Sequence, residues 1–551
     1  MEGFYKEVIE IIKKEKPDKD KLSKLKVKLC NNYKMKRIPS DFDILLNASQ
    51  ADLNLIKKCI QSKPTRSLSG VNVVAIMTKP IKCPHGKCIM CPGGPDSFFG
   101  DTPQSYTGKE PATRRAIRND FDPYLQVFNR LEQYTVLGHP VEKTELIIMG
   151  GTFPSFPIEY QDEFLGYAVK ALNDFSKLFL KGKEVDIEKF KEFFELPGDI
   201  YDDKRQERVK SKIKKLKGKL DFEKELKENE KARIRKVALC LETRPDYCND
   251  KEIKQMIKLG VTRVELGVQS LDDKVLKKIQ RGHSVQDTID STKRLKDAYI
   301  KVGYHMMIGL PGSSTKKDIN QFKELFSNEN FKPDFLKIYP CLITEGTELF
   351  KIWKSGKFKP LTIDQAEKII IDGKKFVPKY CRIMRVQRDI PTTVLKAGAL
   401  MSNLRQDIQN KKDFKCNCIR CREYGTKLKQ KEKIETDIDI VIYEYEASNG
   451  FEFFISAENV KTNTLFGFCR LRLDKNAGIR QLHVVGFQVE IGKEGSIQHK
   501  GLGKQLLEIA ETIAKQNKRK KMFITSGIGV REYYKKFGYK LKDHYMVKVL
   551  N

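Results

Sequence analysis

The chain has 551 residues, and its 105 Lys and Arg against 73 Asp and Glu leave a net charge of +32. This length exceeds a single core and indicates two to four domains, and a hydrophobic content of 40% excludes an intrinsically disordered chain. A charge surplus of this size favours a polyanionic partner, with nucleic acid ahead of an acidic membrane surface. A Lys/Glu-rich surface of the thermophile kind would not explain a surplus of one sign.

Neither a membrane span nor a secretion signal is expected. No run approaches the ~20 apolar residues that cross a bilayer, and charges interrupt the N-terminal stretch MEGFYKEVIEIIKKEK. We therefore expect a soluble, cytoplasmic protein with no membrane partner. Thirteen cysteines in such a protein point to metal ligation or redox chemistry rather than disulfides, and six of them fall in two tight clusters.

Residues 1–70 are expected to form a basic, helical N-terminal region. The stretch 21–40 contains no acidic residue and has seven basic ones, namely Lys21, Lys24, Lys26, Lys28, Lys34, Lys36 and Arg37. Such a run fits contact with nucleic acid, and the alternative is an ordinary solvated helix face.

Residues 71–390 alternate short apolar runs with helical stretches. The runs cover 71–78, 144–151, 237–245, 262–270, 301–311 and 334–340. Strands rich in Val, Ile and Leu that alternate with helices predict βαβ units and a parallel sheet, here an incomplete α/β barrel. The charge-dense segment 180–236 is expected to be helical and to lie on the outside of this barrel.

A first cysteine cluster follows the first predicted strand, in the segment KCPHGKCIMCPGG. Cys83, Cys88 and Cys91 offer three thiolates, which can hold a cubane cluster and leave one iron open to an outside ligand. Loops that follow barrel strands are also where barrel enzymes carry their chemistry. The alternative is a structural zinc site, for which His85 is close in the sequence.

A linker over 391–434 carries the second cysteine cluster, Cys416, Cys418 and Cys421, in the pattern C-x-C-x-x-C. Thiols at this density predict a zinc site that acts as a structural clamp between domains, and a second iron–sulfur cluster is the alternative. Only three ligands are local, so a fourth must come from elsewhere, and Cys381 is the candidate.

Residues 435–551 are expected to form a separate α+β domain. Strands are predicted over 451–459, 464–473, 479–491 and 521–527, with a helix that opens at Lys500-Gly501, a helix around 530–537 and a last strand. The first of these helices begins with the pattern Q-x-x-G-x-G, formed by Gln498, His499, Lys500, Gly501, Leu502 and Gly503. Glycines at a helix start expose main-chain N–H groups, and the helix dipole favours an anion there.

The motifs CPGGPDS, QSYTG, EPATRRAIR, MGGTF, ETRPDYC, ELGVQS, RGH, LKIYP and VQRDIP occur in this order. Together they resemble the catalytic subunit of Elongator, from about residue 65 to the C-terminus. Radical-SAM enzymes usually have three and then two residues between their cysteines, whereas this chain has four and two, and members of this family vary the first gap. The resemblance implies a radical-SAM barrel fused to a GNAT-type acetyltransferase domain, so the predicted fold class is α/β plus α+β.

The resemblance also implies two cofactor sites, and the ends of the predicted barrel strands offer residues for the first of them. A [4Fe-4S] cluster on Cys83, Cys88 and Cys91 would bind S-adenosyl-L-methionine (SAM), held by residues at strand ends, although each of these could singly be a structural salt bridge or cap. The SAM set is Gly150, Gly151, Glu242, Arg244, Glu265 and Gln269. Acetyl-CoA would place its pyrophosphate on the Q-x-x-G-x-G loop, its pantetheine arm beside the predicted strand 481–489, and its thioester near Tyr533. The strand contributes Gln481, Leu482, His483 and Val484.

Three further roles follow from the same resemblance. Lys143 would reach acetyl-CoA from the barrel side. Of Tyr533 and Tyr534, one is expected to serve the thioester and the other to pack in the helix. Glu490 and His483 are the candidates for a general base, between which the sequence does not choose.

In the reaction that the resemblance implies, a SAM-derived radical takes hydrogen from the acetyl methyl group. The carbon then adds to C5 of the wobble uridine of tRNA, and water releases CoA to leave 5-carboxymethyluridine. The partner would be the tRNA anticodon stem-loop, held by residues 21–40 together with Arg114, Arg115 and Arg118. A homodimer or further Elongator-like subunits are the expected assemblies. The alternatives are a protein lysine acetyltransferase with the barrel as scaffold, and a tRNA-binding subunit without chemistry.

Overall fold

The computed structural model describes residues 2–61, 70–182, 184–198, 202–401, 403–411, 414–430, 432, 434–486 and 501–550. In this part of the chain, no helix combines the length and the apolar character that crossing a membrane requires.

The N-terminal region is helical, as predicted. It consists of α1 (Glu2–Glu15), α2 (Lys19–Asn32), α3 (Asp41–Asn47) and α4 (Gln50–Ile60). Side chains of Asp18, Ser40 and Ser49 cap the last three of these helices by accepting main-chain N–H groups. Their apolar faces join the same hydrophobic core as the barrel helices, so this region is part of the main body.

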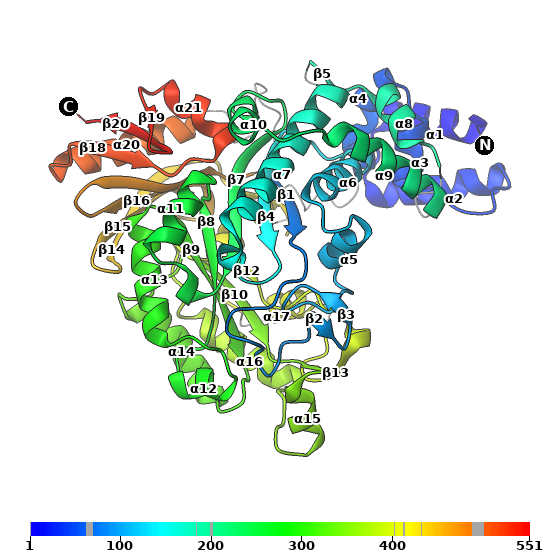
Figure 1. The fold of residues 1–551 in the computed structure, drawn as a ribbon. Helices are drawn as coiled ribbons and strands as arrows, with labels where there is room; N and C mark the ends of the chain where they lie inside the picture. The colour runs from blue at the N-terminus through cyan, green and yellow to red at the C-terminus, as the bar shows by residue number, and fades with distance from the viewer. Residues whose placement is uncertain are drawn as a thin grey trace.

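A seven-stranded parallel sheet forms the centre of the molecule, in the order β1-β4-β7-β8-β9-β10-β12 (Figure 1). Its strands are β1 (Asn72–Met77), β4 (Lys143–Met149), β7 (Arg235–Thr243), β8 (Arg263–Gln269), β9 (Lys301–Ile308), β10 (Phe335–Pro340) and β12 (Arg382–Arg385). The first six match the six predicted runs, and β12 is a strand that the sequence analysis missed. The sheet is open rather than closed, because β1 and β12 remain edge strands.

Helices follow the strands along the chain. They are α5 (Pro111–Arg118), α6 (Pro123–Val136), α7 (Ile158–Phe179), α11 (Asp250–Lys258), α12 (Asp273–Lys278), α13 (Val285–Asp297), α14 (Thr315–Ser327), α15 (Glu348–Lys354) and α16 (Ile363–Lys374). Of these, α5, α6, α7 and α13 pack against strands of this sheet. The charge-dense segment 180–236 contains the short strands β5 (Leu180–Lys181) and β6 (Glu184–Val185), followed by α8 (Ile187–Phe194), α9 (Asp203–Lys217) and α10 (Phe222–Asn229). The described part of this segment is therefore mostly helical, as predicted.

Smaller elements lie at the end of the barrel where the strands finish and in the linker. They are the hairpin β2 (Gly94–Ser97) and β3 (Gly100–Thr102), the pair β11 (Ile343–Thr344) and β13 (Leu395–Ala397), and the helices α17 (Leu404–Asn410), α18 (Ile419–Arg422) and α19 (Tyr424–Lys429).

The C-terminal domain is a second seven-stranded sheet, in the order β14-β15-β16-β17-β18-β20-β19. Its elements are β14 (Asp439–Glu446), β15 (Phe451–Asn459), β16 (Thr464–Leu473), β17 (Ala477–Val484), α20 (Leu502–Gln516), β18 (Lys521–Ile524), α21 (Arg531–Lys535), β19 (Lys540–Lys542) and β20 (Tyr545–Val549). All neighbours are antiparallel except β17 and β18, which are parallel. This is the predicted α+β layout, with β14 as an additional edge strand.

Buried ion pairs fasten this domain to the end of the barrel where the strands begin. Asp334, just before β10, accepts hydrogen bonds at 2.6 and 2.7 Å from Arg480 of β17 and at 2.8 Å from the main-chain N–H of Val302. Arg470 of β16 lies 3.3 Å from the same carboxylate. Burial alone would raise the pKa of Asp334, but the two arginines outweigh it and hold that pKa below its ordinary value.

Candidate functional site

The first cysteine cluster lies in the loop after β1. Its members are Cys83, which is half-buried, and Cys88 and Cys91, which are buried. Residues from three other loops contact the sulfurs. Thr152 Oγ1 lies 3.9 Å from Cys83, Ser105 donates its main-chain N–H to Cys91 at 3.3 Å, and Arg281 donates to Cys88 at 3.6 Å. The thiols therefore face the place where the loops after the strands converge.

The spacing of these sulfurs argues against a single zinc ion. Tetrahedral zinc with bonds of about 2.3 Å brings its sulfur ligands to roughly 3.8 Å from one another. Among the described residues, the three thiols of this loop do not form a group with all ligand atoms within 4.8 Å, although His85 Nε2 lies 3.2 Å from Cys88 Sγ. A wider triangle of thiolates suits a cluster whose ligands bind different irons, so the donor set fits a cubane cluster.

Two glycines after β4 adjoin this loop. Gly150 and Gly151 both have positive φ, at 114° and 106°, and a Cβ at Gly150 would collide with Thr78 Oγ1. The residue after them is Thr152, which contacts Cys83. This is the close backbone approach expected of a ligand-binding turn, directly beside the cysteine loop.

Other members of the predicted SAM set are already engaged in ion pairs. Glu242 and Glu265 are register partners on β7 and β8, and Lys337 bridges the two carboxylates, at 2.8 Å from Glu242. Glu265 also contacts His305 at 2.8 Å and is the third residue of β8, so its predicted position at a strand end is wrong. Both carboxylates thus make ion pairs of the kind that the structural alternative describes, and their role in binding SAM stays a prediction.

Arg244 and Gln269 do lie where their strands end. Arg244 donates to both carboxylate oxygens of Asp246, at 2.8 and 2.6 Å, and to the Gly282 carbonyl at 2.8 Å. Gln269 is the last residue of β8 and has a positive φ of 69°. Arg281 holds the neighbouring Gly267 carbonyl at 2.7 Å while it reaches Cys88, which links this strand end to the cysteine loop.

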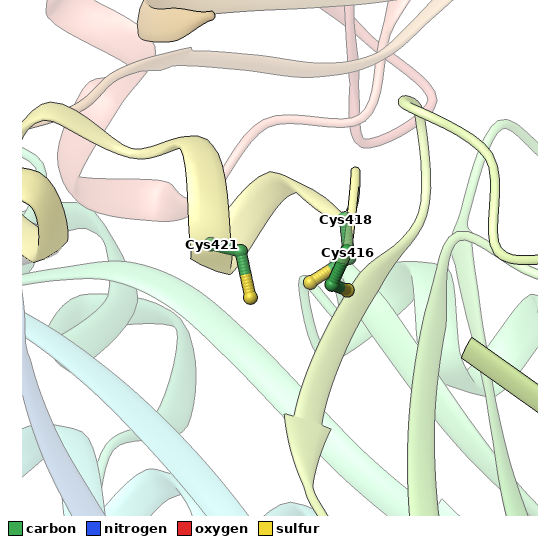
Figure 2. Close-up of side chains that lie close together, drawn as sticks. All are labelled: Cys416, Cys418 and Cys421. Carbon is green, nitrogen blue, oxygen red and sulfur yellow. The ribbon is translucent and has the colours of Figure 1, made fainter. Parts of the chain in front are cut away.

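The second cysteine cluster is tighter than the first. Cys416, Cys418 and Cys421 lie with their sulfurs within 4.8 Å of one another; the first two precede α18 and Cys421 lies in it (Figure 2). The thiols of Cys416 and Cys421 hydrogen-bond to Cys418 and hold the pKa of its thiol well below its ordinary value. A compact group of three thiols is the donor set that a single zinc ion prefers.

The predicted fourth ligand does not join this group. No additional His, Cys, Asp or Glu belongs to it in the part of the chain that the structure describes, and Cys381 instead holds the segment through its main chain. The Cys381 carbonyl accepts the N–H of Ile419 at 3.0 Å. The segment sits between the domains, because Arg422 of α18 pairs with Glu458 of β15 while Glu423 pairs with Arg382 of β12.

Replacing Cys418 with serine is expected to remove zinc and to lower the melting temperature by roughly 5–10 °C, because the segment between the domains loses its cross-link. Cys381→Ser is the matched control and should keep its zinc. Metal analysis and thermal unfolding measure both effects. Full zinc content with an unchanged melting temperature in Cys418→Ser would show that these thiols hold no structural ion.

A cavity of about 720 Å³ lies between the two domains. From the C-terminal domain its walls include Gln481, Leu482, His483, Val484, Gly501, Leu502, Gly503, Tyr533 and Tyr534. From the barrel they include Lys143, Glu145, Arg235, Arg263, Lys301 and Arg382, at the ends where the strands begin. The structure thus brings the described members of the predicted acyl-CoA set to one cavity, whereas Gln498, His499, Lys500 and Glu490 lie outside the described residues.

The tyrosines differ in their surroundings. Tyr534 is 6% exposed and belongs to the core of the C-terminal sheet. Tyr533 is half-buried. Its hydroxyl lies against Gly503 in the first turn of α20, where a Cβ would be only 2.9 Å from it. Gly501 caps that helix with φ 83°, and the ring of His483 stacks on Phe468 with centroids 5.7 Å apart. Tyr533 is therefore the better candidate to touch an acyl group.

The predicted nucleic-acid residues fall into two groups. Those that are exposed are Lys21, Lys24, Lys28, Lys34, Lys36, Arg37, Arg114 and Arg118. Lys26 pairs with Asp41 at 2.7 Å, and Arg115 is buried and donates to the Ala75 carbonyl of β1 at 2.8 Å. The prediction for Arg115 is wrong, because its side chain fastens α5 to the barrel.

Sequence reasoning missed the residues that connect these sites. Lys337, His305 and Arg263 lie on strands, where nothing in the sequence pattern separates a buried charge from a surface one. Arg281 belongs to the RGH motif. That motif contributed to the resemblance, but no role was predicted for its residues. A positive charge followed by glycine just after a helix was the available signal.

Profiles of four protein families match the chain. They are the ELP3 N-terminal domain at 1–68, the radical SAM superfamily at 81–325, the radical SAM C-terminal domain at 333–412 and the acetyltransferase (GNAT) family at 420–539. A tRNA uridine(34) acetyltransferase of Methanocaldococcus infernus is 46% identical over 97% of this chain and 96% of its own length. Human Elongator complex protein 3 is 35% identical over 96% of this chain and 93% of its own length.

A solved structure agrees with these sequence relatives. The archaeal Methanocaldococcus infernus Elp3 with an N-terminal deletion (1–46) superposes with a TM-score of 0.70 at 43% identity, covering 88% of this chain and all of that one.

Proposed function

The chain belongs to the family of Elongator complex protein 3, and from this premise we propose that it modifies the wobble uridine of tRNA. The product proposed is 5-carboxymethyluridine, formed with a [4Fe-4S] cluster, SAM and acetyl-CoA, with zinc as a structural ion. The observation that carries the proposal is the presence, in one chain, of a three-cysteine loop at one end of a parallel barrel and, at the other end, a cavity lined by both domains.

The chain's own residues would share the work as follows. Cys83, Cys88 and Cys91 would hold the cluster, and the Gly150-Gly151 turn would admit the amino-acid end of SAM. When bound, these groups supply a 5′-deoxyadenosyl radical, which can remove hydrogen from an acetyl methyl group. On the acyl side, main-chain N–H groups at the start of α20 would receive the pyrophosphate, and Tyr533 would cover the thioester.

The two sites lie at opposite ends of the strands. β4 has seven residues, so at about 3.3 Å per residue the barrel interior separates them by roughly 20 Å. Ion pairs line that interior from Glu145, 2.9 Å from Arg263, to Lys337, 2.8 Å from Glu242. The joint reaction thus requires the acyl end of the cofactor to enter the barrel past Glu145 and Arg263. The same separation favours the alternative, a protein lysine acetyltransferase with the barrel as scaffold.

Anaerobic reconstitution with iron and sulfide tests the proposal. The loaded protein would be incubated with tRNA, SAM, acetyl-CoA and a reductant, and the nucleosides would be identified by mass spectrometry. We expect carboxymethyluridine only when SAM and acetyl-CoA are both present. Acetylation of a peptide without SAM, with no modified nucleoside, would support the acetyltransferase instead.

Lys143 gives the acyl site a pH dependence. Burial lowers the pKa of Lys143 to about 8 from its ordinary value of about 10.5. Because the charged form binds an anionic ligand, the affinity for acetyl-CoA should be greatest below pH 8 and should fall as the pH rises through it. Lys143→Met should bind several-fold more weakly with a flat profile, whereas Lys143→Arg should keep the affinity at high pH. A wild-type profile in Lys143→Met, measured by calorimetry, would rule this role out.

A further inference from the structure

The hairpin β2–β3 carries an exposed aromatic ring at its tip. Phe98 lies between the two strands and is 61% exposed, which is high for so large an apolar side chain. Its neighbours Asp96, Gly100 and Asp101 are exposed as well. The ring is thus a single apolar point in a polar tip, too small to be the core of a protein–protein interface.

The base of this hairpin is fixed to the cysteine loop. The Cys91 thiol donates to Gln104 Oε1 at 3.1 Å, and Ser105 donates its N–H to the same sulfur at 3.3 Å. Gly94 packs so closely on Gln104 that a Cβ there would lie 2.9 Å from its side-chain nitrogen. The tip is also closed, because Ser97 Oγ donates to the Gly100 carbonyl at 2.6 Å. The position of Phe98 relative to the cysteines is therefore determined.

The Phe98 ring packs against a neighbouring loop. Gly346 has φ 76°, and a Cβ at that position would overlap the Phe98 side chain, so the ring rests against main chain. Phe99 meets it edge-on with centroids 5.1 Å apart. An aromatic ring held in this way presents one face to solvent and loses little side-chain entropy when a flat ligand stacks on it.

Positively charged residues flank the hairpin in the sequence but do not belong to it. Lys82 and Lys87 in the cysteine loop and Lys109 after the hairpin are exposed. The hairpin contributes only the carboxylates of Asp96 and Asp101. Phosphates would be attracted by the flanking loops, and Phe98 would receive a base. A single-stranded RNA loop, with splayed bases between phosphates, has this combination of features.

We propose that Phe98 stacks on a base next to the target uridine and so positions the anticodon loop over the cysteine cluster. This inference rests on the proposed function, from which it takes the substrate, and it adds a positioning residue that acts through stacking rather than charge.

Binding of a fluorescent anticodon stem-loop RNA to the reconstituted full-length protein tests it. Phe98→Ala should raise the Kd about tenfold, within the range of a lost base stack, and should leave the slope of affinity against salt unchanged. Phe98→Trp should bind as wild type. Phe98→Leu keeps an apolar side chain without a π face and should bind as weakly as the alanine variant. Phe451→Ala, a ring 47% exposed on the C-terminal sheet, is the matched control and should not change the Kd.

The outcomes separate this inference from the proposed function. If wild type and Phe98→Ala both bind and modify the RNA with affinities within twofold, stacking is refuted and the function stands. Wild-type affinity in Phe98→Leu would assign the ring to packing on Gly346, which also overturns the inference. A change of oligomeric state in Phe98→Ala, seen by light scattering, would make the tip a protein contact. If wild type binds no stem-loop RNA, both proposals fail.

Discussion

Replacing Cys88 with serine is expected to abolish SAM cleavage and the formation of modified tRNA while the affinity for acetyl-CoA stays unchanged. Three thiolates are the minimum that holds a cubane cluster with one open iron, and a serine hydroxyl does not ionise to take the place of one. The acyl cavity is built from the opposite strand ends and from the C-terminal domain, so it does not depend on this loop.

Iron content, release of 5′-deoxyadenosine and the modified nucleoside measure the effect of Cys88→Ser. Cys59→Ser is the control, because Cys59 is a half-buried thiol of α4 in the N-terminal region. It should keep wild-type iron and activity. If Cys88→Ser still cleaves SAM at the wild-type rate, the cluster is held elsewhere and the assignment of this loop is wrong.

The second large effect concerns the attachment of the two domains. Asp334→Asn is expected to lower the free energy of unfolding by about 3–5 kcal/mol, the usual cost of removing one member of a buried ion pair. In this variant Arg480 loses its main partner. The carboxylate that remains, Glu452, lies 2.8 Å from Arg480 and is shared with Arg472, which lies 3.1 Å away. The amide also leaves the buried guanidinium of Arg470 uncompensated.

Urea unfolding and hydrogen exchange at the start of β10 and β17 test this expectation. Asp372→Asn removes an ion pair with Lys375 on the surface of α16, and it should cost no more than about 0.5 kcal/mol. Equal stabilities of the Asp334 and Asp372 variants would mean that the buried network does not hold the domains together.

The sheets could be predicted from the sequence because their strands are apolar runs between helices. β12 was not predicted because its sequence, Arg-Ile-Met-Arg, has two arginines in four residues. It becomes a strand only by pairing with β10. The individual members of the site were harder. On α5, Arg114 and Arg118 are one turn apart and share the exposed face, whereas Arg115 points to the barrel. Helical spacing would have separated them.

The predictions that Cys381 joins the second cysteine cluster and that Glu265 lies at a strand end were wrong for a different reason. Nearness in sequence to a motif does not determine where a thiol points, and Cys381 contacts the segment of the second cysteine cluster through its main-chain carbonyl. Glu265 was predicted to lie at a strand end because the register between β7 and β8 was not known. That register places Glu265 beside Glu242, where both carboxylates pair with Lys337. The pairing register between strands is a tertiary property that cannot be read from a single sequence.

The most direct test of the joint reaction uses acetyl-CoA deuterated on its methyl group. We predict that the 5′-deoxyadenosine released in the presence of tRNA gains deuterium, because the hydrogen it takes comes from the acetyl methyl group after the acyl end of the cofactor has entered the barrel. Unlabelled 5′-deoxyadenosine, formed alongside a modified uridine that carries no deuterium, would contradict it. That result would mean that the barrel and the acyl-CoA cavity serve separate reactions.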